Sequence, residues 1–387
     1  MPIVLAGFTA FLDLYATQPL LPMLMDVFEA SQFDVSLTVT ASTLAVAVAA
    51  PGAGRLADRI GRKRVIVGSA IALTLATALA AASRNLGDLI FWRVVQGLFT
   101  PGVMAVTVAY IHDEWPSGGT GSATAAYVSG TVVGGFVGRA TTAAVADAFG
   151  WRAAFLALAL LNLATAAALA LWLPSERQRA AQSDRPAVSA VTVHLRNAQL
   201  QSTFAIGLCV LFTLVAMFTY ATFLLAAPPF NLRTSALGSL FFVYLIGAVI
   251  TPVAGRWIDH FGHRRSLGTA IGVSMLGALL TLWPSVTTIV SGLAVCAAGV
   301  FVAQATASSY VGAAAEQDRG LAVGLYASFY YIGGSLGAAL PGLFWTRGGW
   351  PATVALVALV QVLTVAMAFT FWGDRRSSAP PLPEAGL

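Results

Sequence analysis

PGAGRLADRIGRKR, at residues 51–64, is the stretch of sequence that decides the fold, because PVAGRWIDHFGHRR at residues 252–265 repeats it. One constant offset of 201 residues aligns seven identical residues without a gap: the proline, an alanine, two glycines, two arginines and the aspartate. Self-similarity at a fixed spacing indicates a repeated structural unit. We therefore interpret the chain as two related halves that carry this motif at the same place.

The composition indicates a membrane protein. Of the 387 residues, 58% are hydrophobic and 10% are charged, and the mean hydropathy is +0.79. A soluble domain carries about 25% charged residues, because water must solvate its surface. The net charge of +5 does not indicate nucleic-acid binding, since the basic residues form short clusters between long apolar stretches.

Twelve apolar stretches are long enough to cross a membrane, which takes about 20 residues in a helix. The first is interpreted as a retained span, because it lacks the basic start of a signal peptide and runs past the length of a signal-peptide core. We expect the spans at roughly 4–27, 36–54, 65–83, 88–111, 120–147, 151–173, 203–227, 235–255, 266–284, 287–312, 320–345 and 350–372.

The predicted fold is an all-α membrane protein whose twelve transmembrane helices form two pseudo-symmetric six-helix halves. The expected divisions are an N-terminal bundle at 1–173, a cytoplasmic linker at 174–202, a C-terminal bundle at 203–372 and a disordered cytoplasmic tail at 373–387. Parallel repeats in a membrane pack about an axis along the membrane normal, and the ligand site lies between them near the midplane. Shorter matches at an offset of 199 residues support the division: GGFVG at 134–138 with GGSLG at 333–337, and Gly150-Trp151 with Gly349-Trp350.

The distribution of basic residues predicts the orientation. If the N-terminus is cytoplasmic, fifteen Lys and Arg residues lie in cytoplasmic segments and four lie in external ones. Because cytoplasmic loops are enriched in Lys and Arg, we expect a multi-pass protein of the cytoplasmic (inner) membrane with both termini inside the cell. A monomer is expected, because two six-span halves already enclose a site.

The repeated motif carries a resemblance to a known family. Gly54, Leu56, Ala57, Asp58, Arg59, Gly61, Arg62 and Lys63 fill the positions of a loop that resembles the signature of the major facilitator superfamily, and FWRVVQG at residues 91–97 resembles its fourth-span motif. The resemblance covers essentially the whole chain and implies the fold and activity of a secondary transporter. LYATQPLLP at 14–22 and the glycine series at 130–138 look most like bacterial drug or sugar efflux permeases. Gly134-Gly135 departs from the Gly-Pro of drug/proton antiporters, so the resemblance favours transport in general over drug antiport.

The two motif loops are candidate gates. Asp58 lies beside Arg59, Arg62 and Lys63 at the membrane face, and Gly54 and Gly61 would permit a tight turn between two spans. In one interpretation Asp58 bonds basic residues or a helix N-terminus of the other half as a latch. In the other, the loop is a solvated charge cluster that only sets the topology. The second copy contains Gly255, Asp259, Gly262 and Arg264, with His260 and His263 at basic positions that would make it pH-sensitive.

Three charged residues fall inside predicted spans, where a functional role is the default interpretation. Thr9, Asp13 and Thr17 recur at helical spacing and form one polar stripe on the first span. Asp13 is therefore a candidate proton-binding or cation-binding group. The alternative is a structural ion pair between Asp13 and an arginine of another span.

The two intramembrane arginines also have two interpretations each. Arg93, with Gln96 on the same side of its helix, either contacts substrate or Asp13, or satisfies buried backbone carbonyls. Arg139 closes a stripe of small residues that lets helices approach closely; the stripe contains Gly130, Gly134 and Gly138, next to Gly135. Its counterpart in the second half is Ala338, and this asymmetry favours a role toward substrate. The alternative is a pair with Asp13 or Asp147.

Uncharged polar and aromatic residues complete the candidate site, with Tyr15 and Gln18 foremost. Further candidates for the cavity wall are Tyr127, Tyr220, Gln304, Tyr326 and Tyr330. The sequence contains no nucleotide-binding loop, metalloprotease or nucleophile-elbow motif, so we expect no enzyme activity, no cofactor and no metal site.

The function predicted from these features is secondary active transport of a small organic solute across the membrane, by proton-coupled efflux. The alternative is proton symport or facilitated uptake of a small, possibly anionic solute, which the two arginines would suit. A non-transporting membrane receptor is a remote alternative, because the chain offers no sizeable soluble domain to pass on a signal. The expected partners are the solute, protons and the lipid bilayer, with no nucleic acid.

Overall fold

The computed structural model describes residues 1–114, 120–175, 193–315 and 319–373, and within them the chain forms helices and no strand. The first bundle contains α1 (Pro2–Leu12), η1 (Gln18–Leu20), α2 (Leu21–Phe28), α3 (Gln32–Ile60), α4 (Arg62–Ala81), α5 (Leu86–Glu114), α6 (Thr120–Phe149) and α7 (Trp151–Trp172). The second contains α9 (Ala198–Ala226), α10 (Thr234–Ser239), η2 (Leu240–Tyr244), α11 (Leu245–Leu280), α12 (Val286–Ala314) and α13 (Arg319–Phe371). The predicted all-α fold is confirmed.

Two of the long helices are interrupted by single glycines. Gly262 has a φ of 77° inside α11, and Gly349 has a φ of 54° inside α13. Within the described residues, seven helices are long and apolar enough to cross a membrane, and the last of these contains Gly349. Each of the twelve expected spans overlaps helical residues. The chain is therefore a multi-pass membrane protein.

The first expected span is not one helix. α1 ends at Leu12, turns follow at residues 13–17, and η1 and α2 complete the crossing. Pro19 and Pro22 explain the break, because proline has no N–H to donate and its ring clashes with the preceding turn of a helix. Thr9, Asp13 and Thr17 were expected to form one polar stripe on a single helix. That expectation was wrong, because the α-helix ends at Leu12.

The repeated glycines of the two motif loops do not all make the turn that the sequence predicted. Gly54 and Gly255 lie inside helices with open space where a side chain would project, so neither makes a turn. The turn falls on the second glycine of each motif: Gly61, with a φ of 101°, separates α3 from α4, and Gly262 is its counterpart. Left-handed φ values favour glycine, which has no Cβ to clash.

Glycines bring helix backbones into contact at equivalent places in both halves. A Cβ on Gly134 or Gly138 would overlap the backbone carbonyl of Phe8 or Leu12, which packs α6 directly on α1. Gly333 and Gly337 pack α13 directly on the backbone of α9 in the same way. On α6, Gly130, Gly134 and Gly138 all lie against the backbone of α1, while Gly135 lies nearest the Arg139 side chain.

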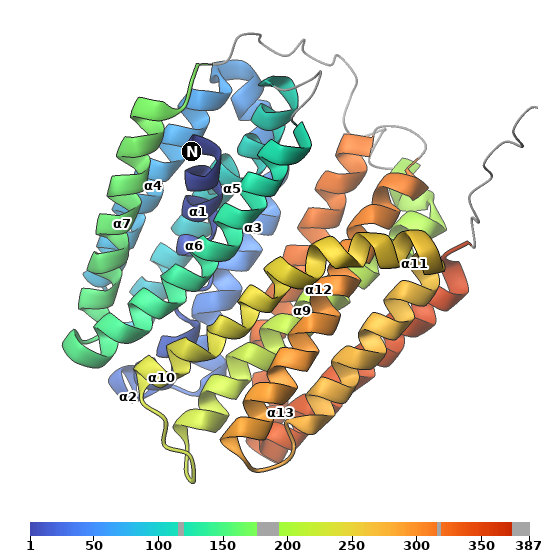
Figure 1. Cartoon of the computed structure of the whole chain (residues 1–387). Helices are drawn as coiled ribbons and strands as arrows, with labels where there is room; N and C mark the ends of the chain where they lie inside the picture. Colours follow the sequence, from blue (N-terminus) through green and yellow to red (C-terminus); the bar gives the residue numbers. More distant parts are fainter. Residues whose placement is uncertain (115–119, 176–192, 316–318, 374–387) are drawn as a thin grey trace, which may run out of the picture.

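The two bundles differ in separation at their two ends. We call the end that carries the N-terminus, Gly61 and Gly262 the terminal face, and the other end the distal face. Figure 1 shows the bundles side by side near α2 and α10 on the distal face, and diverging toward the terminal face. On the distal side Ser235 Oγ donates to Asp147 Oδ2 over 2.8 Å, and in the middle Thr43 and Ser335 share a hydrogen bond of 2.8 Å.

The linker expected at 174–202 ends earlier than the sequence indicated, because α9 begins at Ala198 with Asn197 as its N-cap. The Asn197 side chain accepts from the N–H groups of Gln199 and Leu200, which satisfies two of the free donors at the helix start. Most of the expected linker, at 176–192, and the expected tail from residue 374 lie outside the described residues.

Candidate functional site

Arg139 of α6 lies at the junction of the two halves. Its side chain is 3% exposed, and its guanidinium carbon lies 4.9 Å from the ring centroid of Tyr15, 4.7 Å from that of Phe241 and 4.8 Å from that of Tyr244. Tyr15 belongs to the first half and the other two rings to the second. Aromatic faces attract a cation, and the attraction grows when water is excluded. The two halves therefore build one aromatic box around this charge.

Hydrogen bonds fix the position of the Arg139 side chain. Its Nε donates to Gln18 Oε1 over 2.9 Å, and its Nη1 donates to the carbonyl of Gly135 over 2.7 Å. Gln18 Nε2 in turn donates to Thr219 Oγ1 of α9 over 3.0 Å. Gln18 and Thr219 are separated by the repeat offset of 201 residues. Because equivalent residues touch only near a symmetry axis, the bond lies at the centre of the molecule.

The positive charge of Arg139 has no carboxylate partner among the residues that the structure describes. No Asp or Glu oxygen in them lies within the 4.0 Å of an ion pair, and Asp147 instead accepts from Ser235. The alternative pairing with Asp13 or Asp147 is therefore not made. Burying an uncompensated charge carries a large desolvation penalty, which the aromatic faces and two hydrogen bonds offset in part.

Tyrosines adjoin the aromatic box on the side of α13. The hydroxyl of Tyr15 is buried without a hydrogen-bond partner in the described residues, and it lies 3.4 Å from where a Cβ on Gly334 would stand. Nearby on α13, the Tyr330 ring packs against those of Tyr326 and Tyr331, with centroids 6.1 and 5.6 Å apart. The wall of the junction is thus rich in rings that carry hydroxyl groups.

Some of these residues were predicted and some were not. Sequence reasoning found Tyr15, Gln18, Arg139, Tyr326 and Tyr330, and it also found Gln304, whose Oε1 accepts from Tyr326 over 2.8 Å. It missed Thr219, Phe241, Tyr244 and Tyr331; the Phe-Phe-x-Tyr run at residues 241–244, in a span that faces the other half, was the usable signal. Tyr127 and Tyr220 are engaged elsewhere, donating to the carbonyls of Met104 and Ala338.

Asp13 lies away from the aromatic box, toward α7 of its own half. The side chain is 2% exposed, and its Oδ2 accepts from Asn162 Nδ2 over 2.6 Å. Its Oδ1 has no hydrogen-bond partner in the described residues, and no arginine nitrogen there reaches it as an ion pair. The carboxyl group is therefore buried and half-satisfied, and the Arg93 guanidinium lies nearby, bonded to the Asp13 backbone carbonyl and not to its carboxylate. Such a group can take up a proton with little rearrangement.

Arg93 of α5 is fully buried and holds the break in the first span together. Its Nε donates to the carbonyl of Thr38 over 3.0 Å, its Nη1 to that of Asp13 over 2.9 Å, and its Nη2 to that of Leu14 over 2.6 Å. The Asp13 and Leu14 carbonyls lie at the break, where regular α-helical bonding ends, and Arg93 supplies them with donors, whereas the Thr38 carbonyl lies inside α3. Its remaining bonds go to the side chains of Gln96 and Ser42. Of the two interpretations of Arg93, this geometry matches the one that satisfies carbonyls.

Arg62 of the first motif loop forms two ion pairs within its own half. Arg62 forms an ion pair of 2.5 Å with Asp113 at the end of α5, and it lies 3.9 Å from Asp58. In the second half, His263 shares a hydrogen bond of 3.1 Å with Ser309 of α12. Partial burial lowers the pKa of His263, against a smaller opposite effect of Asp259. Asp58 and Asp259 are both exposed.

Comparisons with known proteins agree with this architecture. The sequence matches the family model described as Major Facilitator Superfamily at residues 3–248 and again at 206–386. It is 31% identical to the Inner membrane transport protein YnfM of Escherichia coli over 93% of this chain and 87% of the relative. It is 29% identical to the Uncharacterized MFS-type transporter YybF of Bacillus subtilis over 93% of this chain and 90% of the relative.

Two solved structures are similar in fold. One is a bacterial homolog of the human lysosomal transporter Spinster in an inward-facing and occupied conformation, with a TM-score of 0.78 and 15% identity over 95% of each chain. The other is the human organic anion transporter MFSD10, with a TM-score of 0.72 and 17% identity over 95% of this chain and 98% of that one. At these identities the likeness concerns the fold alone.

Proposed function

The chain belongs to the Major Facilitator Superfamily, and on that premise we propose that it is a secondary active transporter that moves a small organic solute across the cytoplasmic membrane by alternating access. The single observation that carries the proposal is Arg139. A buried cation without a carboxylate partner, enclosed by rings from both halves, is a group that a ligand of opposite charge would complete. The junction of parallel repeats is also where such proteins bind their ligands.

The bound solute contacts residues of both halves in this proposal. Arg139 holds an anionic or strongly polar group, Gln18 orients it, and the rings of Tyr15, Phe241 and Tyr244 pack against its apolar part. Guanidinium binds carboxylate in a bidentate manner, and its unshared N–H groups are available here because only Nε and Nη1 make hydrogen bonds to the described residues. An anionic solute is therefore the substrate class that we favour.

Alternating access follows from the difference between the two faces. The contacts of Ser235 with Asp147, and of Thr43 with Ser335, close the distal side and the middle, while the bundles diverge at the terminal face. We assign the terminal face to the cytoplasm from the excess of Lys and Arg in its loops, so that both termini are inside. The conformation described here is then inward-open, and the distal contacts are those that break when the protein turns outward.

Proton coupling is assigned to Asp13. Its carboxyl group is buried, has one unbonded oxygen and no ionic partner in the described residues, and belongs to the same irregular segment as Tyr15. Protonation of Asp13 would weaken the hydrogen bond that its carboxylate accepts from Asn162. The irregular segment would then shift, and Tyr15 in the aromatic box would move with it. When proton entry down its gradient drives the exit of the solute, the result is efflux by antiport. A solute that is anionic would equally suit proton symport, which the same residues can perform.

The motif loops serve as the cytoplasmic gate in this proposal. Asp58, Arg59, Gly61, Arg62 and Lys63 in the first half would exchange their own-half contacts for contacts with the second half when the terminal face closes. The second copy, with Gly255, Asp259, Gly262 and Arg264, is the partner loop. The protein is proposed to act as a monomer, since one chain supplies both walls of the site.

The test is a flux assay on purified protein in proteoliposomes that contain a pH-sensitive dye. The panel comprises aromatic carboxylates, aliphatic carboxylates, neutral sugars and a cationic dye, and the variants are Arg139→Gln and Asp13→Asn. We expect carboxylates to trigger proton movement in the wild type. Arg139→Gln should reduce solute movement by about tenfold or more, because it removes the buried charge that binds the anion in this proposal. Asp13→Asn should abolish proton movement and leave solute exchange.

The direction of the proton signal separates antiport from symport. Movement of sugars or of the cationic dye that is unaffected in Arg139→Gln would overturn the anionic substrate class. Solute movement without a proton signal, unchanged in Asp13→Asn, would reject coupling and leave a facilitator. A folded wild-type protein that moves no member of a broadened panel would reject the transport proposal.

A further inference from the structure

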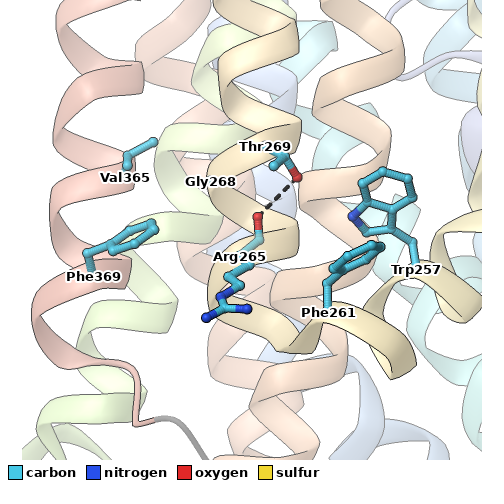
Figure 2. Close-up of a pocket in the computed structure, with 7 residues that line it drawn as sticks. All are labelled: Trp257, Phe261, Arg265, Gly268, Thr269, Val365 and Phe369. Carbon is cyan, nitrogen blue, oxygen red and sulfur yellow. Dashed lines mark hydrogen bonds between the residues drawn. The ribbon is translucent and has the colours of Figure 1, made fainter.

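A cavity of about 400 Å³ lies on the outside of the second half, far along the chain from the residues around Arg139. It opens between α11 and α13 near the terminal face. Figure 2 shows two of its aromatic side chains on α11, two apolar side chains facing them from α13, and a cation between. The lining residues are Trp257, Phe261, Arg265, Gly268, Thr269, Val365 and Phe369.

The walls of this cavity are apolar and exposed. Trp257 is 46% exposed, Phe261 44% and Phe369 43%, so three large rings present much of their surface to the surroundings of the protein. In a soluble protein such a patch would mark a protein interface, but here the flanking helices cross a membrane. Aromatic side chains are enriched where a membrane helix meets the headgroup region. Because the flanking helices cross the membrane, we expect these rings to face lipid.

The cavity also contains a cation. Arg265 is exposed, and among the described parts of the chain no carboxylate oxygen lies within 4.0 Å of it. Arg264 next to it lies over the Phe369 ring, with its guanidinium carbon 4.6 Å from the ring centroid. Arg256 precedes them by two to three helical turns, and Asp259 is the one acidic residue of this segment. The charge around the opening of the cavity is positive.

We infer that this cavity is a binding site for an anionic phospholipid. One acyl chain would fill the apolar space between Phe261, Val365 and Phe369, and the phosphate of the headgroup would bind Arg265. A free phosphate would have no use for the apolar walls, and a neutral lipid would leave the arginine unmatched. Basic pockets between membrane helices on the cytoplasmic side favour anionic headgroups for this reason. The inference does not depend on what is transported.

The first half supplies a matched control. The repeat offset of 201 residues pairs Arg265 with Arg64, so both halves keep the arginine at the same place. It pairs Trp257 with Leu56 and Phe261 with Ile60, so the aromatic wall belongs to the second half only. If lipid binding required only a basic residue at the membrane surface, both arginines would contribute equally. Because the aromatic wall belongs to the second half, we predict that lipid binding depends on Arg265 and not on Arg64.

The experiment is lipid titration of the full-length detergent-purified protein by native mass spectrometry. Phosphatidylglycerol and phosphatidylcholine with identical acyl chains are compared on the wild type, Arg265→Gln and Arg64→Gln. We expect the wild type to prefer phosphatidylglycerol, and Arg265→Gln to weaken its binding about fivefold, the equivalent of about 1 kcal/mol for one basic residue at a membrane surface. Phosphatidylcholine binding should be unchanged in that variant, and Arg64→Gln should bind both lipids as the wild type does.

Blocking the cavity gives a second variant. A Cβ on Gly268 would lie 2.9 Å from the far end of the Phe369 ring, which can rotate away, so Gly268→Leu is expected to fill the space and weaken both lipids. Equal losses in Arg265→Gln and Arg64→Gln would overturn the site and leave general charge attraction. Equal binding of the two lipids by the wild type would also overturn it. Displacement of the lipid by glycerol phosphate at similar concentrations would identify an anion site without a lipid.

Discussion

The two halves of this protein share their helix order and their glycine contacts, but they differ in where buried charge is found. Asp13, Arg93 and Arg139 are buried in the first half, whereas no buried Asp, Glu, Lys or Arg occurs in the described residues of the second. Ala338 stands where Arg139 stands, and Thr219 where Gln18 stands. A shared scaffold thus carries ionic chemistry in one half and neutral polar contacts in the other.

A pair of equivalent side chains illustrates the difference. Asn162 of α7 and Gln361 of α13 are separated by 199 residues, the offset of the Gly-Trp repeat. Asn162 donates to the carboxylate of Asp13, while Gln361 donates to the hydroxyl of Ser274 over 2.8 Å. The same amide position therefore supports a titratable group in one half and a fixed neutral bond in the other. The comparison teaches that equivalent positions of one scaffold hold a buried carboxyl group in the first half and only neutral polar groups in the second.

The largest effect is expected where the first half depends on a charge for its fold. In Arg93→Lys one ammonium group with three donors replaces a planar guanidinium that makes five buried hydrogen bonds, so several buried acceptors lose a donor. Each such group destabilises by about 1–3 kcal/mol. We expect a fall in melting temperature of about 5–10 °C in detergent, measured by thermal-shift size-exclusion chromatography.

The matched variant is Arg139→Lys in the same half. Its hydrogen bonds go to one side chain and one carbonyl of its own helix turn, so its melting temperature should fall by about 3 °C or less while transport is lost. If the two lysine variants lose the same stability, the division between a structural and a ligand-binding arginine fails.

An intermediate effect is expected at the shared glycine contacts, and it should be equal in the two halves. Gly134→Ala and Gly333→Ala each insert a Cβ into a backbone carbonyl of the facing helix, so the helices must separate. Overpacking of this kind destabilises by about 1–3 kcal/mol. Gly54→Ala and Gly255→Ala are the controls, because both positions are helical with open space, and alanine there should be neutral or stabilising by up to about 1 kcal/mol. Unequal losses at Gly134 and Gly333, by thermal shift, would break the structural equivalence of the halves.

The smallest effect concerns the motif loops. The repeat pairs Arg62, which bonds Asp113, with His263, which bonds Ser309. Because partial burial lowers the pKa of His263 below its ordinary value of about 6.5, the unfolded chain takes up this proton first as the pH falls. The stability from the neutral histidine is complete above about pH 6.5 and is lost as the pH falls through the folded pKa.

The measurement is the melting temperature at about pH 7.5 and about pH 5.5. The wild type should lose about 1–2 °C more on acidification than His263→Gln, whose amide bonds Ser309 at both pH values. Identical losses in the two proteins would assign the acid sensitivity to other groups.

The sequence predicted the architecture because its signals are physical requirements of a membrane. Three signals each favour one structural solution: the apolar stretches of span length, the glycines at positions 134 and 138, and the repeated motif at 51–64. The break after Leu12 was not predicted, although Pro19 gave a hint, because its stability depends on Arg93 from a distant span. The same distance hid Phe241 and Tyr244, which join Arg139 only through the docking of the two halves.

The break in the first span has a consequence for how the protein is made. The Leu14 carbonyl accepts from Ser42 of the second span and from Arg93 of the fourth, which follows it by 79 residues, so the first span enters the bilayer before its own backbone is fully satisfied. Lipid offers no substitute partner for a free carbonyl. We therefore expect the first span to reach its final structure only after the fourth span has been inserted, so that the earliest synthesised segment is among the last to be completed.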